Sequence, residues 1–213
     1  MIVIYGSSMS PFVRKAMVFA IEKGIPFDPQ PGGSRATGPD FAKASPFGKI
    51  PAMKDGDFML ADSTAIVTYF DAIKPEPNLI PLEPKARART IFYEEFADTL
   101  ACDCGGKIFF TRVVGPKFLG LETDPAVADQ AQREQFPKLV DYLERVIPAS
   151  GYLVEDRFTL ADIAVASPFA TMAMADCVVD PATHPKTAAY LAGILARPSF
   201  AGLIEKERAF LAA

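Results

Sequence analysis

The stretch IVIYGSSMSPFVRKAMVFAIEKG, residues 2–24, sets the pattern for the first part of the chain. Residues 2–5 are apolar and mostly β-branched, which is typical of a buried strand. Apolar residues then recur at helical spacing over residues 11–23, and Gly24 ends that spacing as glycine commonly does after a helix. A strand, a loop and a helix in this order predict the beginning of a βαβ unit.

The pattern continues to Pro75 with short strands and helices. Asp55-Gly56 lies between two apolar runs and is a strong hairpin signal. Lys74-Pro75 ends the last helical run. The predicted segments are residues 27–30 (strand), 39–46 (one or two helical turns), 51–54 and 57–60 (strands) and 63–73 (helix). The order βαβ, short helix, ββα predicts an α/β domain with a four-stranded mixed sheet and helices on both faces.

A proline-rich connector separates this domain from a second part with different periodicity. Residues 75–85, PEPNLIPLEPK, carry four prolines, and such a stiff segment indicates a domain boundary. Beyond it no convincing strand occurs, and apolar spacing predicts helices over residues 86–114, 126–147, 159–175, 183–196 and 198–211. Gly105-Gly106 interrupts the first of these and predicts a kink or a close backbone approach. We therefore expect an α/β domain (1–76), a linker (77–85) and an all-α helical domain (86–213).

Composition excludes several classes of function. The chain has 213 residues, half of them apolar, and a net charge of −4, which argues against nucleic acid or an anionic membrane surface as a partner. No apolar run approaches the length of a membrane span, and the N-terminus lacks a basic flank. Three cysteines do not form a disulfide framework, so a cytoplasmic location is expected. One histidine and scattered cysteines predict that no metal is bound. Cys102 and Cys104 lie two residues apart, off a common helix face, and are expected to be core residues.

The loop before the first helix holds the main candidate for chemistry. Pro11 suits the first helical position, so Ser10 falls at the N-cap, where a hydroxyl can simply cap the helix. The same place offers a second use. Unpaired N–H groups and partial positive charge stabilise a nearby thiolate, and the Ser10 hydroxyl could donate one further hydrogen bond to it. Ser7 and Ser8 are rival donors for the same role.

Two further segments offer ligand contacts. Ile50-Pro51 begins a strand, and a cis bond there would turn the backbone of Ile50 outward to pair with an extended peptide-like ligand. Asp62-Ser63 begins a helix. Either residue could be only a cap, but together they could bind the ammonium and carboxylate of an α-amino acid group.

These segments, in this order, resemble the glutathione transferase family over nearly the whole chain. SSMSPFVRKAMV (7–18) is similar to the start of serine-type members, and to the zeta-class loop with Met9 in place of its cysteine. SPFGKIPAM (45–53), LADSTAIVTYF (60–70) and FTLADIAVA (158–166) match the other motifs of the family. In the last of these, Thr159 and Asp162 can form a capping box, with Phe158 and Ile163 as a hydrophobic staple. The chain is identified as a serine-type, bacterial-like member.

The resemblance implies a thioredoxin-like N-terminal domain that binds glutathione. The Ile50-Pro51 bond would be cis, and the backbone of Ile50 would pair with the cysteine of glutathione. The γ-glutamyl end would meet Asp62 and Ser63. Ser10 would be the catalytic residue that bonds the sulfur. The remaining residues expected at glutathione are Phe12, Lys49 and Pro51.

The implied activity is glutathione transfer in the cytoplasm, serving detoxification. The bound thiolate would attack a small, largely apolar electrophile in a neighbouring pocket formed by Met9, Phe96, Leu100 and Cys104. A homodimer is expected. Two alternatives stay open: a non-catalytic glutathione-binding or regulatory protein, and a glutathione-dependent isomerase or dehalogenase.

Overall fold

The computed structural model describes residues 1–33 and 39–212. Contacts between Cα atoms divide the chain into two compact units. One consists of Met1–Ile80 with Pro198–Ala213, and the other of Pro81–Arg197. The last helix, α10 (Pro198–Ala212), therefore groups with the first unit, although its sequence neighbours lie in the helical one.

The first unit contains a four-stranded mixed sheet in the order β2-β1-β3-β4. Strands β1 and β2 are parallel, β3 runs antiparallel to β1, and β4 runs antiparallel to β3. This confirms the predicted fold class. The elements in chain order are β1 (Ile2–Tyr5), α1 (Pro11–Glu22), β2 (Phe27–Gln30), α2 (Pro39–Ala44), β3 (Ala52–Asp55), β4 (Phe58–Ala61) and α3 (Ser63–Ile73).

The hairpin turn lies one residue later than predicted. Asp55 pairs with Phe58, so the two loop residues are Gly56 and Asp57 rather than Asp55 and Gly56. The reason is that Asp55 still extends β3. Gly56 has φ +57°, the left-handed backbone that two-residue hairpin loops require.

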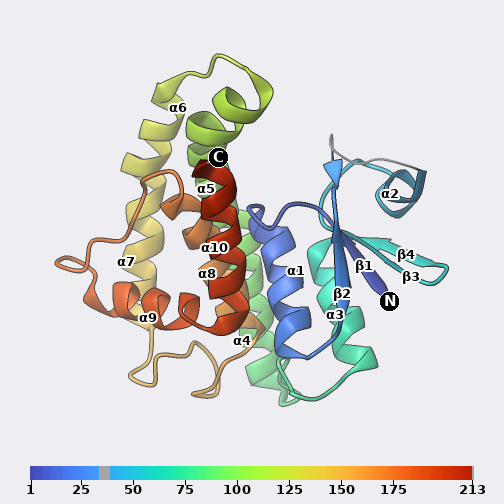
Figure 1. The fold of residues 1–213 in the computed structure, drawn as a ribbon. Coiled ribbons are helices and arrows are strands. Elements are labelled where there is room, and N and C mark those ends of the chain that lie inside the picture. Colours follow the sequence, from blue (N-terminus) through green and yellow to red (C-terminus); the bar gives the residue numbers. More distant parts are fainter. Residues whose placement is uncertain (34–38, 213) are drawn as a thin grey trace. The chain divides into compact units, whose positions relative to one another are not determined.

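The two faces of the sheet pack against different helices (Figure 1). Tyr5 and Ala52 join Phe41 of α2 in one cluster, and the rings of Tyr5 and Phe41 meet edge to face at 5.9 Å between centroids. Ile4 and Met53 alternate with them, point to the opposite face and are fully buried. Helices α1 and α3 pack against β1 and β3 and against each other.

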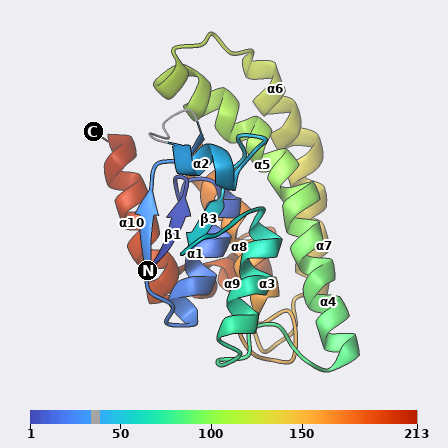
Figure 2. The same cartoon turned by 90° about the vertical axis from the view of Figure 1, so that its right-hand side faces the viewer.

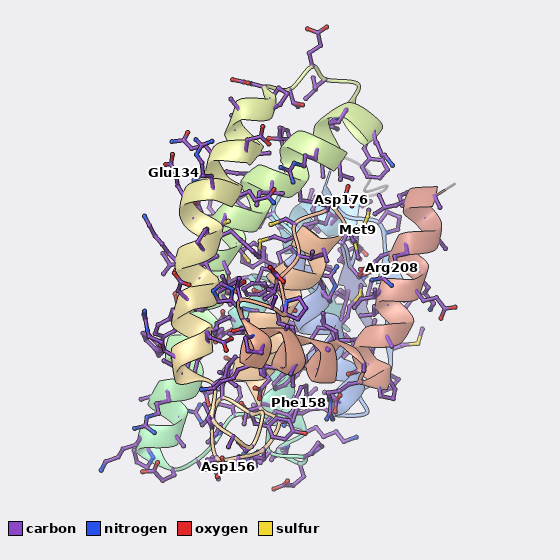
Figure 3. The ribbon with its side chains drawn as sticks, turned by 90° about the vertical axis from the view of Figure 1, so that its left-hand side faces the viewer. Met9, Glu134, Asp156, Phe158, Asp176 and Arg208 are labelled. Carbon is purple, nitrogen blue, oxygen red and sulfur yellow. The ribbon has the colours of Figure 1, made fainter. Side chains whose placement is uncertain are left out.

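Helix α10 packs against α1 within the first unit (Figure 2). The Arg14 guanidinium of α1 forms an ion pair with Glu207, and the Ser199 hydroxyl donates to the Glu22 carboxylate. Figure 3 labels Arg208, the residue that follows Glu207 on α10.

In the second unit the predicted helix over residues 86–114 is helical throughout but changes type. α-Helical and π-helical turns alternate in it, because parts of the chain are wound more widely than an α-helix. A second such change divides the helix predicted over 126–147. The elements are α4 (Pro84–Glu95), η2 (Phe96–Ala101), α5 (Cys102–Phe109), η3 (Phe110–Leu119), α6 (Pro125–Gln130), η4 (Ala131–Gln135), α7 (Phe136–Val146), α8 (Leu160–Ala173) and α9 (Pro185–Leu195), where η denotes π-helix.

Helix α8 forms the centre of this unit. A Cβ atom on Gly105 of α5 would lie 3.1 Å from Met172 Cγ of α8, so Gly105 permits the close approach, whereas a Cβ on Gly106 would meet nothing within 4 Å, and α5 continues through both. The predicted capping box at the start of α8 is present, with the Thr159 N–H donating to Asp162 Oδ2 at 2.9 Å. The Leu153 N–H and the Tyr190 hydroxyl also donate to Asp162, which fixes the preceding loop.

Over the residues that the structure describes, no single helix is both long and apolar enough to cross a membrane. The bent pair α9 and α10 meets those limits only when its two helices are counted together.

Candidate active site

The three segments that the sequence singles out meet at one end of the sheet. Tyr5 pairs with Gln30 on one side and Ala52 on the other, and Ala52 pairs with Ala61. The loop to Ser10 follows Tyr5, Ile50-Pro51 comes directly before Ala52, and Asp62-Ser63 follows Ala61. The pairing register therefore brings segments from distant parts of the sequence to the same end of the sheet.

Two glycines, neither of which was predicted to belong to the site, allow these segments to pack closely. A Cβ atom on Gly6 would lie 2.6 Å from Val13 Cγ2 and 3.1 Å from the Ile50 Cβ. A Cβ atom on Gly32 would lie 2.8 Å from Ile50 Cγ2. Gly6 also has φ +132°, a backbone that side chains rarely adopt. A glycine directly after a strand is the signal that could have revealed this packing.

Ser10 is the N-cap of α1 by position, but its hydroxyl makes no capping hydrogen bond. The Ser10 hydroxyl therefore does not serve as a helix cap, which was the purely structural role considered for it. The Ser10 N–H donates to the Ser7 carbonyl at 3.0 Å, and the Ser10 carbonyl accepts from the Arg14 N–H at 2.9 Å. The first turn of α1 carries no acidic residue, so nothing within that turn cancels its partial positive charge.

The rival hydroxyl of Ser7 has a different role. Ser7 Oγ accepts a hydrogen bond from the Met9 N–H at 3.4 Å and so helps to shape the loop. Its side chain is exposed, and Ser8 is partly buried beside it. Ser10 alone of the three stands at the helix end.

Asp62 caps α3. Its Oδ1 accepts from the N–H groups of Thr64 at 2.9 Å and Ala65 at 3.1 Å. Its φ of 84° is unusual for a residue other than glycine, which marks a strained position at the end of β4. Ser63 is buried at the first helical position, where the backbone N–H has no partner within the helix.

The loop before β3 presents the remaining predicted residues. The Ile50-Pro51 bond is cis, as the resemblance implies. Ser45 donates to the Lys49 carbonyl at 2.6 Å, which holds the loop, and the Lys49 side chain is exposed. On α1, Phe12 is partly buried. Pro51 is buried.

The residues predicted to form the second pocket lie in both units. Met9 is buried beside Ser10, while Phe96, Leu100 and Cys104 follow one another along the helical unit. Leu100 is 58% exposed, and the ring of Phe96 packs on Tyr142. The Cys104 thiol is fully buried 3.7 Å from the Ala131 carbonyl, and desolvation raises its pKa to about 12, as expected of a core cysteine.

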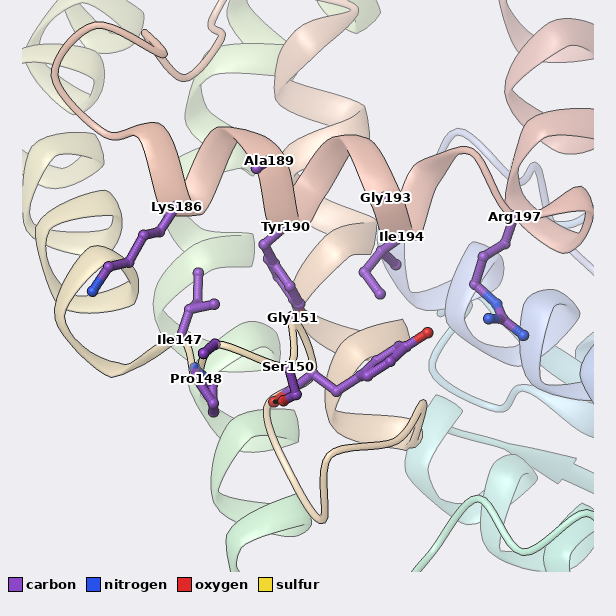
Figure 4. A pocket seen from close by; sticks show the side chains of 12 residues that line it. Ile147, Pro148, Ser150, Gly151, Lys186, Ala189, Tyr190, Gly193, Ile194 and Arg197 are labelled. Carbon is purple, nitrogen blue, oxygen red and sulfur yellow. Dashed lines mark hydrogen bonds between the residues drawn. The ribbon is translucent and has the colours of Figure 1, made fainter.

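A sizeable cavity lies away from the predicted site residues. Its volume is about 480 Å³, and it opens between α9 and the loop after α7, within the helical unit (Figure 4). Tyr152 lies along it, and its charged lining residues, Lys186 and Arg197, are both cationic. None of the predicted site residues lines it. In the described part of the chain, no three His, Cys, Asp or Glu side chains gather as metal ligands.

Comparison with known proteins identifies both parts of the chain. Residues 4–78 match the model of the glutathione S-transferase N-terminal domain, and residues 101–198 match that of the C-terminal domain. A glutathione S-transferase of Hyoscyamus muticus is 31% identical over 210 residues, covering 95% of this chain and 97% of that protein. Glutathione S-transferase 3 of Zea mays is 32% identical, covering 92% and 90%. The crystal structure of glutathione transferase F7 from Populus trichocarpa, 26% identical, superposes with a TM-score of 0.83 over 96% of this chain and 98% of that one.

Proposed function

Because this chain belongs to the glutathione S-transferase family, we propose that it binds glutathione at the end of the sheet and activates its thiol. Family membership supports glutathione transferase activity in general. The observation that carries the proposal for this chain is the pairing register, which brings to one end of the sheet the strand ends that lead to Ser10, Ile50 and Asp62. In this proposal residues 1–76 bind glutathione and residues 86–213 form the helical domain, with 77–85 as the linker.

The ends of the ligand suit the groups present. Both capping bonds of Asp62 use Oδ1, so Oδ2 can accept from the ammonium of the γ-glutamyl end. The carboxylate of the same end would bind at the start of α3, to the N–H of Ser63. The backbone of Ile50 would pair with the cysteine residue, Lys49 would meet the glycine carboxylate, and Phe12 and Pro51 would complete the surface.

Ser10 is the residue that we assign to catalysis. A free thiol has a pKa of about 8.5, so only a small fraction is ionised near neutral pH. The hydroxyl of Ser10 would donate to the sulfur beside a helix N-terminus that has no acidic residue in its first turn. Both interactions favour the thiolate and lower its pKa. The thiolate would then attack a small, largely apolar electrophile and form a thioether as the leaving group departs.

Replacing Ser10 tests this assignment. We expect Ser10→Ala to lower kcat for an aryl halide by about 10- to 100-fold, since a hydrogen bond to a charged group contributes about 1.5–3 kcal/mol. Calorimetry should show glutathione binding within about threefold of wild type, because the contacts at both ends of the ligand persist.

Ser7→Ala is the matched control, and its kcat should stay close to the wild-type value. A large loss with Ser7→Ala and none with Ser10→Ala would transfer the role to Ser7. If the wild-type protein is retained on immobilised glutathione but turns over none of a broad set of electrophiles, the non-catalytic binding alternative replaces the proposal.

The pocket for the electrophile, formed by Met9, Phe96, Leu100 and Cys104, stays a prediction, as do the serine-type subclass, the cytoplasmic location and a role in detoxification.

A further inference from the structure

Helices α1 and α10 lie in a fixed antiparallel register. Arg14 meets Glu207 and Glu22 meets Ser199, so a step of eight residues forward on α1 matches a step of eight residues back on α10. Eight helical residues span about 12 Å. The two polar contacts therefore hold both ends of one interface, and the fully buried Phe200 of α10 lies in the sequence between them.

The contact nearer to Ser10 is a bidentate ion pair with almost no exposure to solvent. Arg14 Nη2 lies 2.7 Å from Glu207 Oε2, and Arg14 Nε lies 3.2 Å from Oε1. The side chains are 0% and 2% exposed. A parallel pair of N–H···O bonds fixes the orientation of both planar groups, and a buried charge that loses its partner is strongly unfavourable. This contact therefore permits little sliding or rotation of one helix against the other.

Arg14 belongs to the first turn of α1. Its N–H donates to the Ser10 carbonyl, so the turn that begins at Ser10 closes at Arg14. Helical side chains lean toward the helix N-terminus, which places the guanidinium alongside this turn. The Ser10 hydroxyl makes no capping bond of its own that would hold the turn. The ion pair is thus an anchor for the backbone that carries Ser10.

We propose that Glu207 is a positioning residue for Ser10: by clamping Arg14, the last helix fixes where the Ser10 hydroxyl meets the thiol. The inference rests on the proposed function, and it assigns a part in the chemistry to a residue 197 positions away from Ser10 in the sequence. It requires that loss of the clamp disturb the first turn of α1 and the ionisation of bound glutathione, in addition to stability.

The test compares Glu207→Gln with Ser199→Ala, which removes the contact at the far end of the same interface. Amide hydrogen exchange of residues 7–17 is measured without ligand. The turnover rate gives kcat, and thiolate absorbance as a function of pH gives the thiol pKa of bound glutathione. In Glu207→Gln we expect faster exchange, a rise in thiol pKa and a fall in kcat of about tenfold or more. Ser199→Ala should match wild type in all three, and Glu207→Asp should recover part of the loss.

The sign of the pKa change separates misplacement from a simple charge effect. Glu207→Gln removes the carboxylate that faces the Arg14 cation, and this change in charge alone would lower the thiol pKa. A fall in thiol pKa therefore overturns the proposal, as does a lower melting temperature with unchanged kcat and exchange. If Glu207→Gln does not fold, the double variant Arg14→Met/Glu207→Leu removes both charges and is measured in the same way. If wild type ionises no glutathione, the proposed function fails, and the exchange experiment alone decides whether Glu207 holds the first turn.

Discussion

At the scale of single residues, a buried lysine shows how much one side chain can organise. The Lys23 ammonium is 0% exposed and donates to the carbonyl oxygens of Lys74 at 2.8 Å, Pro75 at 3.0 Å and Pro77 at 2.9 Å, beside the carboxylate of Asp71. It thereby ties the end of α1 to the end of α3 and to the proline-rich segment that follows.

Replacing this lysine should destabilise the fold. We expect Lys23→Met to lower the free energy of unfolding by about 3 kcal/mol or more, because it leaves Asp71 and three carbonyl groups without their buried donor. Urea denaturation measures the change. Lys74→Met is the control, since the exposed Lys74 ammonium donates to the Gly24 carbonyl at 3.0 Å, and its loss should cost less than about 0.5 kcal/mol. Equal losses in both variants would contradict this account.

At the scale of elements, one helix caps another. His184 is the N-cap of α9 but makes no capping bond with its side chain. Glu144 of α7 performs this role, because its carboxylate accepts from the N–H groups of Lys186 at 3.0 Å and Thr187 at 2.9 Å and from the Thr187 hydroxyl at 2.8 Å. Desolvation raises the pKa of Glu144, but these hydrogen bonds outweigh it, so the net pKa is lowered.

This capping contact should depend on pH. A carboxyl whose pKa is lower in the folded state stabilises the fold above its unfolded pKa, and the contribution is lost as the pH falls through the folded value. Glu144→Gln should therefore melt a few degrees lower than wild type near pH 7, and the difference should shrink near about pH 3. Thermal denaturation at both pH values tests this. A gap that is the same at both would show that the charge of Glu144 is not what stabilises α9.

Some of the elements could be predicted from the sequence, and others could not. Strands and helices up to residue 75 were predictable, because apolar spacing, Gly24 and the proline at position 75 mark their ends locally. The π-helical segments were not, because a wider turn leaves no distinct pattern of residue types. At the site, Ser10, Ile50 and Asp62 carried local signals. Glu207 did not, since its partner lies 193 residues away.

At the scale of the whole molecule, an exposed aromatic ring offers a test of the predicted homodimer. Phe47, on the loop before β3, is 90% exposed, more than any other large apolar side chain in the described part of the chain. If the chain forms the homodimer that the family resemblance predicts, we expect a second copy of this chain to bury Phe47. Its neighbour Lys49 is among the residues proposed to bind glutathione, so association would also affect that loop.

Replacing Phe47 tests this association. Phe47→Asp should shift the protein from dimer to monomer, because a charge at an apolar contact opposes burial. Light scattering after size-exclusion chromatography measures the mass. Leu82→Asp is the control, since Leu82 is 78% exposed in the connector and should leave the mass unchanged. A wild-type monomer, or a Phe47→Asp dimer, would contradict the proposal.

The return of α10 to the first unit has a consequence for engineering. A fragment that stops at residue 80 would lack Glu207, which pairs with Arg14, and would uncover the side of α1 on which α10 packs. A chimaera that grafts the glutathione half of this protein onto a foreign helical half must therefore transplant both ends of the chain as a matched set.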